Sequence, residues 1–429
     1  MSALESLIAT SGEAPTMDSL DFSLPPANTA VVDRRQHVRA YPTSASTLTP
    51  TGTRTVRIRL GGDDFVDSSS VRIQYTINET ASVSGKKLVP FCGPWGAWSQ
   101  VYLRSNGVEL DNIPQYGRFH QQYGWNQLGM LEQYGEAGIC GMGGSWVDGT
   151  PNTPAMGTIA VGGSYTVIHK VHVSMFNSGK YLPVRYMPLE LEMTLNSSTA
   201  DWLNAGSGAN STSYSISNIQ LIYDAYILDE AVQESFYKAL LANRALSIPT
   251  MTVYQVVQSI PAGSTTFSFS AVRAFSRLSH VWLTFRAAGN RSCEFFNPTT
   301  LTGTGATPAL ADGGCPTARL SIGPHYWPDP QPNSSIPELF YQLQKSLPNI
   351  PKIGRDVFAA QTANTGAFTI LFDVRKVPHD PTSSISTRSG DLLRVDLQNL
   401  TANLVTECWL TMFAFSVTGV RESGCTLLT

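Results

Sequence analysis

Hydrophobic and polar residues alternate along much of the chain, and this period of two predicts β-strands. In residues 54–60, Val56, Ile58 and Leu60 share one face, while polar side chains occupy the other. The same alternation, or a run of β-branched and aromatic residues, predicts further strands over 71–77, 100–104, 165–175, 189–195, 215–228, 251–260, 265–272, 278–285, 367–374, 392–397 and 407–417. The chain is therefore predicted to be mostly β.

Helical periodicity is confined to three segments, residues 116–132, 230–243 and 336–347. In the second segment, Phe236 and Leu240 fall on one apolar stripe, and Glu230 lies in the first turn, where an acidic side chain is favourable. Many strands with few helices favour sandwiches or barrels over other architectures.

Two long segments carry no periodic pattern. Residues 135–163 are rich in glycine, and residues 287–332 are rich in Gly, Pro, Thr and Asn. Patternless segments of this length are usually functional or disordered, so both are predicted to be projecting loops. Trp146 and Trp327 lie in them and are predicted to anchor contacts between subunits, because an exposed tryptophan gains most from burial against a neighbour.

The two halves of the chain repeat four features in the same order. The paired segments are 99–103 with 279–283, 119–125 with 339–343, 188–195 with 391–397, and 218–227 with 408–415. We therefore expect Val101 and Val281 to occupy equivalent strands, and Leu191 and Val395 likewise. The predicted organisation is an N-terminal arm over 1–27, a first domain over 28–245 and a second over 246–429.

The size of each repeat indicates its fold. Eight strands in about 200 residues, with long excursions and an inserted helix, are typical of a jelly roll of two facing sheets. An immunoglobulin sandwich, at about 100 residues, is half that size. The predicted fold class is all-β, with two tandem jelly-roll β-sandwich domains and a few short inserted helices.

The composition contains few charges. Charged residues make up 14% of the chain, against about 25% in an ordinary soluble protein. A hydrophobic content of 42% excludes a disordered chain. Because charged surface resists association, a net charge of −3 on so few ionisable groups predicts that partners cover much of the surface.

The N-terminal residues point to a protein partner. Residues 1–33 hold five acidic side chains and no Lys or Arg, so they are not expected to contact a genome directly. Leu4, Leu7 and Ile8 form a short apolar stripe at helical spacing, the candidate contact of an inner arm. The opening residues lack the basic region of a secretory signal, which favours synthesis in the cytosol.

No set of residues indicates catalysis, a metal site or a bound cofactor. The Gly-Asp-Asp sequence at 62–64 is interpreted as a turn between strands. His169 and His172 are three apart in a predicted strand, so we expect them on opposite faces, unable to share a metal. The six cysteines contain no C-x-x-C pair and are expected to be free thiols.

Three features of the sequence together resemble a known protein family. They are the two predicted tandem jelly rolls, the stretch Leu-Pro-x-x-x-x-Pro-Leu-x-Leu-x-Met over 182–193, and the aromatic strand 219–228 that leads into a helix. In these features the chain resembles the double jelly-roll major capsid proteins. These belong to the lineage of adenoviruses, virophages and Polinton-like DNA viruses. The resemblance spans residue 28 to the end and implies a homotrimer of nearly hexagonal outline. Such trimers tile an icosahedral shell beside neighbouring capsomers and minor or penton capsid proteins. It implies a place in the virion and no sequence-specific nucleic-acid binding, and leaves open whether a membrane lies beneath the shell.

Two other functions remain as alternatives. A carbohydrate-binding β-sandwich protein that also hydrolysed its sugar would need paired carboxylates facing one cleft, which adjacent aspartates in an extended chain do not provide. A trimeric viral spike protein would also be rich in β-structure, but an internal duplication is not typical of a shaft with a single head. The capsid interpretation is therefore preferred.

Overall fold

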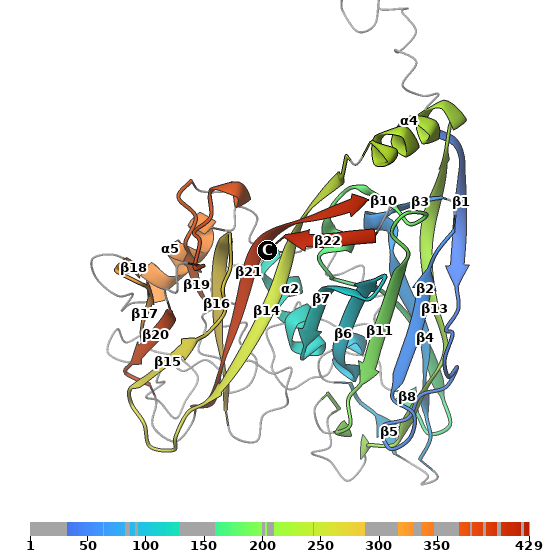
Figure 1. The fold of residues 1–429 in the computed structure, drawn as a ribbon. Helices are drawn as coiled ribbons and strands as arrows, with labels where there is room; N and C mark the ends of the chain where they lie inside the picture. The colour runs from blue at the N-terminus through green and yellow to red at the C-terminus, as the bar shows by residue number, and fades with distance from the viewer. Residues whose placement is uncertain are drawn as a thin grey trace, which may run out of the picture.

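The computed structural model describes residues 32–62, 64–81, 86–90, 93–127, 159–199, 202–203, 210–242, 244–287, 316–328, 336–346, 369–377, 380–388, 392–400, 405–421 and 424–428. They form two groups of sheets that lie side by side, with the strands of residues 32–228 on one side and those of residues 246–428 on the other (Figure 1). Each strand pair joins two strands of the same group. Among the described residues, no helix has the length and apolarity needed to cross a membrane.

The first group contains two large sheets and a small one. One large sheet has the order β10 (Tyr181–Pro183), β3 (Phe65–Asp67), β13 (Tyr214–Leu228), β4 (Arg72–Glu79) and β9 (Ser164–Lys170), with β1 (Val32–Ala40) also paired to β13. The other has the order β2 (Thr55–Leu60), β11 (Leu189–Leu195), β6 (Trp98–Ser105) and β7 (Val108–Pro114). The small sheet consists of β12 (Asn210–Ser211), β5 (Lys87–Leu88) and β8 (Ile159–Ala160).

The second group repeats this arrangement. One sheet has the order β14 (Leu246–Ser259), β21 (Val405–Arg421), β16 (Leu278–Ala287) and β19 (Ile370–Asp373), with β22 (Gly424–Leu428) also paired to β21. The other has the order β15 (Phe267–Ala271), β20 (Leu393–Gln398), β17 (Thr317–Ile322) and β18 (His325–Trp327). Most strands of the two groups therefore correspond one to one. Strands β14, β21, β16 and β19 take the places of β1, β13, β4 and β9, and strands β15, β20, β17 and β18 take those of β2, β11, β6 and β7.

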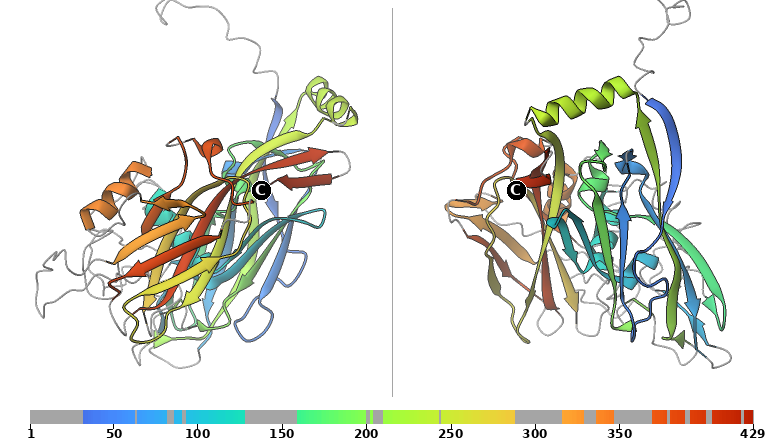
Figure 2. Two further views of the ribbon diagram at one scale, coloured as in Figure 1. Left: turned by 60° about the vertical axis from the view of Figure 1, so that its left-hand side comes forward. Right: turned by 45° about the vertical axis from the view of Figure 1, so that its right-hand side comes forward.

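Within the described residues, three α-helices accompany the strands. Helix α2 (Tyr116–Gln127) follows β7, and α5 (Ile336–Ser346) follows β18 at the equivalent place in the second group. Helix α4 (Glu230–Leu241) connects β13 to β14 and lies at one end of the molecule (Figure 2). The Asp229 side chain accepts a hydrogen bond from the Ala231 backbone N–H, which caps the start of α4. All three helices begin at the residues that the periodicity predicts.

The repeat predicted from the sequence is confirmed in three of its four features and wrong in one. Leu191 on β11 and Val395 on β20 do occupy equivalent strands, but Val101 lies on β6 and Val281 on β16, which are not equivalent. The equivalent of β6 is β17, and that of β16 is β4. The two segments look alike because each buries a valine and a leucine two residues apart, a pattern that reports burial and not position in the sheet.

The predicted loop over 287–332 is wrong in part, because β17 and β18 lie within it. Ala318, Leu320 and Ile322 alternate with polar residues and are all buried, and a turn at Gly323 leads into β18. The predicted loop over 135–163 likewise contains β8 at its end. Residues 135–158, 288–315 and 329–332 of these segments are outside the described residues.

Candidate functional site

Helix α2 of the first sandwich packs against the second sandwich. The Thr411 hydroxyl on β21 donates a hydrogen bond to Oε1 of Gln122, at 3.3 Å, and the rings of Phe119 and Phe413 lie 6.3 Å apart. Strands β14 and β22 lie against β7 of the first sandwich. Residues 281–285 and 410–414 are buried in succession, as expected of strands covered on both faces. The two sandwiches therefore share one continuous apolar core.

Arg118 is a buried charged residue in this contact. Its Nη2 donates hydrogen bonds to Oγ1 of Thr284 and to the carbonyl oxygen of Phe285, each at 3.0 Å. Its guanidinium carbon lies 5.0 Å from the ring centroid of Trp409. Burial lowers the pKa of Arg118 to about 9, with a smaller contribution from Arg286, so the side chain remains protonated at neutral pH. A buried cation thus crosses the boundary between the sandwiches.

Three histidines gather on the side of α2 that faces the first sandwich. The ring of His120 lies 4.6 Å from that of His172 and 5.4 Å from that of His169, measured between centroids. The prediction that His169 and His172 point to opposite faces is therefore wrong. Strand β9 ends at Lys170, so the alternation of a strand does not extend to His172. Within the described part of the chain, these histidines do not form a group that could hold a metal ion.

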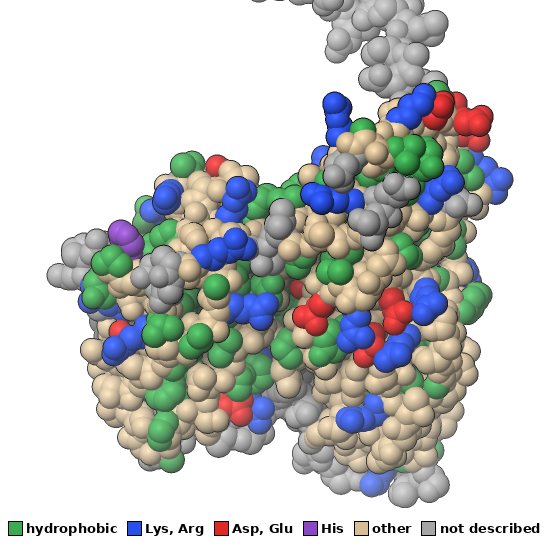
Figure 3. Space-filling model, viewed as in Figure 1, with side chains coloured by type: hydrophobic (Ala, Val, Ile, Leu, Met, Phe, Trp, Pro, Cys, Tyr) green, Lys and Arg blue, Asp and Glu red, His purple; other side chains and the backbone are tan. Residues whose placement is uncertain are grey.

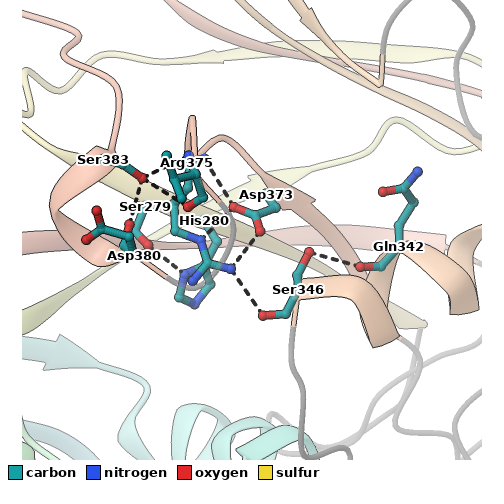
Figure 4. Close-up of polar contacts among 9 residues, drawn as sticks. Ser279, His280, Gln342, Ser346, Asp373, Arg375, Asp380 and Ser383 are labelled. Carbon is teal, nitrogen blue, oxygen red and sulfur yellow. Dashed lines mark hydrogen bonds and ion pairs between the residues drawn. The ribbon is translucent and has the colours of Figure 1, made fainter. Parts of the chain in front are cut away.

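A second polar cluster lies within the second sandwich (Figure 4). Ser279 and His280 are adjacent on β16, with the Ser279 hydroxyl 3.1 Å from Nδ1 of His280, and Asp373 is the strand partner of His280. Asp373 instead pairs with Arg375, whose Nε lies 2.8 Å from Oδ1 and whose Nη2 lies 2.6 Å from Oδ2. Arg375 also donates to the carbonyl of Ser346 at the end of α5, a favourable place for a cation.

This cluster has the residue types of a hydrolytic triad but not its geometry. Ser279 and His280 are buried, and the Asp373 carboxylate is occupied by Arg375. Burial alone would raise the pKa of Asp373, but the hydrogen bonds and charge of Arg375 lower it overall. Burial lowers the pKa of His280 to about 3, so it is a neutral core side chain. The arrangement joins β19 to α5 and does not present a nucleophile to solvent.

The outer faces of two equivalent sheets carry opposite charges side by side. On the first sandwich, Glu192 of β11 accepts hydrogen bonds from Nε of Arg57, at 2.8 Å, and from Nη1 of Arg104, at 3.5 Å. On the second, Asp396 of β20 accepts one from Nε of Arg394, at 2.8 Å. Figure 3 shows acidic and basic side chains together on the first of these faces. The arginines of these pairs are partly exposed, and ion pairs at exposed side chains contribute below about 1 kcal/mol each.

The fold has clear counterparts among solved structures, although the sequence matches no family model and no curated protein. A chain of the PBCV-1 virus capsid superposes with a TM-score of 0.65 at 13% identity, covering 92% of this chain and 96% of the other. A chain of the Sputnik virophage superposes with a TM-score of 0.61 at 9% identity, covering 97% and 92%. The Faustovirus major capsid protein gives 0.57 at 10% identity, covering 97% of each chain. The protein is a double jelly roll.

Of the predicted interface and arm residues, the structure describes only Trp327. Trp327 lies on β18 of the second jelly roll and not in a loop. Its side chain is half-buried and packs against the core of its own chain, so only part of it is available for contact with another subunit. Beside it, Tyr326 is 42% exposed. Trp146, Leu4, Leu7 and Ile8 lie outside the described residues.

Sequence reasoning missed the residues of α2 that join the two jelly rolls. Arg118 is the one Lys or Arg within residues 116–127, in a segment otherwise made of aromatic, amide and glycine residues and one histidine. A single basic residue on a helix otherwise without charged side chains was the sequence feature that could have indicated a buried contact. Its buried partners, Thr284 and Phe285, lie more than 160 residues away and could not be inferred from the helix alone.

Proposed function

We propose that the chain is a structural major capsid protein, three copies of which form a pseudo-hexameric capsomer of an icosahedral virus shell. The observation that carries the proposal is the fixed pair of jelly rolls, which are equivalent in strand order and joined through α2. A trimer of such pairs has six similar sandwiches around its axis and so approximates a hexagon. The full-length likeness to capsid chains supports the same function.

The proposed role is mechanical and not enzymatic. The Ser279, His280 and Asp373 cluster is buried and closed by Arg375, which supports a structural use of these residues. The proposed partners are two further copies in the trimer, neighbouring capsomers and minor or penton capsid proteins. The proposed location is the virion, after synthesis and assembly inside the host cell.

Light scattering during size-exclusion chromatography tests this function. We expect light scattering to give the purified protein three times the mass of one chain, and electron microscopy to show particles of hexagonal outline. A monomer with affinity for a glycan would instead support the carbohydrate-binding function. An elongated trimer with a narrow shaft would support a spike. Either result would contradict the proposal.

We infer that the half-exposed end of β18 contributes to contacts between subunits. Trp327 and Tyr326 lie on this short edge strand, with the Arg319 guanidinium 3.9 Å from the Tyr326 ring centroid. Trp146 is proposed as a second anchor on the first jelly roll. Trp327→Ala is expected to weaken the trimer at least tenfold while the circular dichroism of the subunit stays unchanged. An unaltered trimer dissociation constant would remove Trp327 from the interface.

Residues 1–27 are proposed to be an arm on the inner side of the shell that binds a protein neighbour. Their acidic side chains disfavour both a genome and an anionic membrane, and Leu4, Leu7 and Ile8 supply the apolar contact. Removing residues 2–27 is expected to leave trimers intact and to reduce the yield of closed particles several-fold, counted by electron microscopy. Normal particle yield from the truncated chain would show that the arm is dispensable.

A further inference from the structure

The cluster of His120, His169 and His172 is closed off from solvent by aromatic side chains. All three histidines are buried. The Trp95 ring stacks on His120 at 4.5 Å, with the planes 19° apart, and the Tyr123 ring lies 4.7 Å from that of His172. Burial among aromatic rings stabilises neutral imidazoles and makes their charged forms costly.

The hydrogen bonds of the cluster suit neutral rings. Nε2 of His120 and Nδ1 of His169 lie 3.2 Å and 3.0 Å from the carbonyl oxygen of Lys170, so both nitrogens donate, because a carbonyl only accepts. Nδ1 of His120 has no hydrogen bond of good geometry, and neither has either ring nitrogen of His172, although the nearby Asn177 side chain raises the pKa of His172 and so opposes part of the effect of burial. A proton added at Nδ1 of His120 would create a buried donor without a good acceptor.

The charged groups that act on the cluster also oppose its protonation. Burial is the main cause that lowers the pKa of each of the three histidines, and that of His169 falls to about 4. The positive charges of Arg72 on β4 and Lys170 on β9 lower these pKa values further. The facing phenols of Tyr75, Tyr116 and Tyr123 are uncharged in this pH range.

A buried carboxyl, that of Asp111, contacts the segment that follows His172. Asp111 of β7 accepts a hydrogen bond from the backbone N–H of Ser174, two residues after His172. Burial raises the pKa of Asp111 to about 6. It therefore takes up its proton before the histidines do and becomes neutral, so it supplies no negative charge to balance them in acid.

Helix α2 connects this cluster to the contact between the jelly rolls. His120 faces the first jelly roll, whereas Arg118 and Gln122, two residues before and after it, bond to the second. Positions two apart on a helix point in nearly opposite directions. We propose that the three histidines form an acid-sensitive latch, in which their protonation displaces α2 from the first jelly roll and thereby releases its contact with the second. This inference does not depend on the proposed capsid function.

The sign of the pH dependence follows from the direction of the shifts. Histidines whose pKa is lowered in the closed form bind more protons once the cluster is exposed. The closed form is therefore fully stable above the ordinary histidine pKa of about 6.5 and loses stability as the pH falls from there toward about 4. Asp111, whose pKa is raised, acts in the opposite sense below about pH 6 and offsets part of the effect of one histidine.

Cys425 provides a direct measure of opening. It is buried, and its Sγ lies 3.5 Å from the carbonyl oxygen of Ser105 in the first jelly roll, across the contact between the two. The full-length protein is incubated between pH 7.5 and 4 with a pyridyl disulfide, which stays reactive in acid. Mass spectrometry then gives the fraction of Cys425 labelled. We expect labelling to rise at least tenfold between pH 6 and 4 while the β-sheet circular dichroism persists.

Two variants test whether the histidines set this transition. His172→Phe keeps the ring packing and removes both ring nitrogens, and His120→Gln keeps an amide donor for the Lys170 carbonyl. Each is expected to shift the half-labelling pH downward by at least half a unit and to reduce proton uptake on opening by about one. The control is His37→Gln, since the His37 side chain is 57% exposed on β1, and it should leave the half-labelling pH unchanged.

Three results would overturn the latch. In the first, Cys425 stays unlabelled down to pH 4. In the second, both cluster variants open at the wild-type pH. In the third, labelling rises only together with loss of the circular dichroism signal, which would mean that acid unfolds the chain instead of separating its jelly rolls. Because the third result is read from the wild type, it remains decisive even if a variant folds poorly.

Discussion

Arg118→Ala is expected to lower the free energy of unfolding by about 2–4 kcal/mol, the sum of a cavity and two lost hydrogen bonds in a buried contact. The substitution removes the side chain that lies under Trp409 and leaves the Thr284 hydroxyl and the Phe285 carbonyl without this donor. Equilibrium denaturation at pH 7.5, followed by circular dichroism and tryptophan fluorescence, measures the loss.

A second substitution separates volume from hydrogen bonding at this position. Arg118→Met fills much of the same space without a donor and relieves the cost of burying a charge, so it should lose about half as much stability as Arg118→Ala. Arg104→Ala is the matched control, since Arg104 is partly exposed and its ion pair with Glu192 contributes below about 1 kcal/mol. If Arg118→Ala and Arg104→Ala lose equal stability, Arg118 does not join the jelly rolls as described.

Trp282→Ala is expected to be the most destabilising single change considered, at about 3–5 kcal/mol. Trp282 lies on β16, is fully buried and has its ring centroid 4.5 Å from that of Phe413. Because β16 is covered on both faces, the surrounding side chains cannot collapse into the cavity that the indole leaves. The midpoint of denaturant unfolding, at unchanged slope, measures the loss.

The control for Trp282 is an aromatic residue outside the core. Tyr341 on α5 is 62% exposed, so Tyr341→Ala should change the free energy of unfolding by less than about 0.5 kcal/mol. A loss below about 1 kcal/mol for Trp282→Ala would contradict the description of β16 as a strand buried on both faces.

The strands that fold with one buried face were predicted well from the sequence. Strand β2 spans Thr55–Leu60, within the predicted 54–60, and Val56, Ile58 and Leu60 are all fully buried. The reason is local, because alternation along one strand is enough to define its inner face. Strand β1 was missed, since Val32–Ala40 carries three arginines and a histidine on an edge strand, where charge replaces the apolar pattern.

The long-range arrangement of the candidate site was not predictable in the same way. The three histidines meet because β9 ends at Lys170 and α2 packs against the residues that follow β9. The spacing of His169 and His172 in the sequence predicts neither the end of the strand nor the position of the helix. Similarly, the contact of Arg118 with β16 depends on how one jelly roll docks on the other.

The amino-acid pattern alone predicts that the chain is β-rich, that its halves repeat and that helices begin near residues 116, 230 and 336. These features arise from periodicity and composition, which act over a few neighbouring residues. The equivalence of β16 with β4, and the position of α2 between the jelly rolls with His120 buried, follow only from the folded structure. The physical reason is that burial on both faces erases the alternation that marks a strand's place, and contacts between distant residues are set by packing of whole sheets.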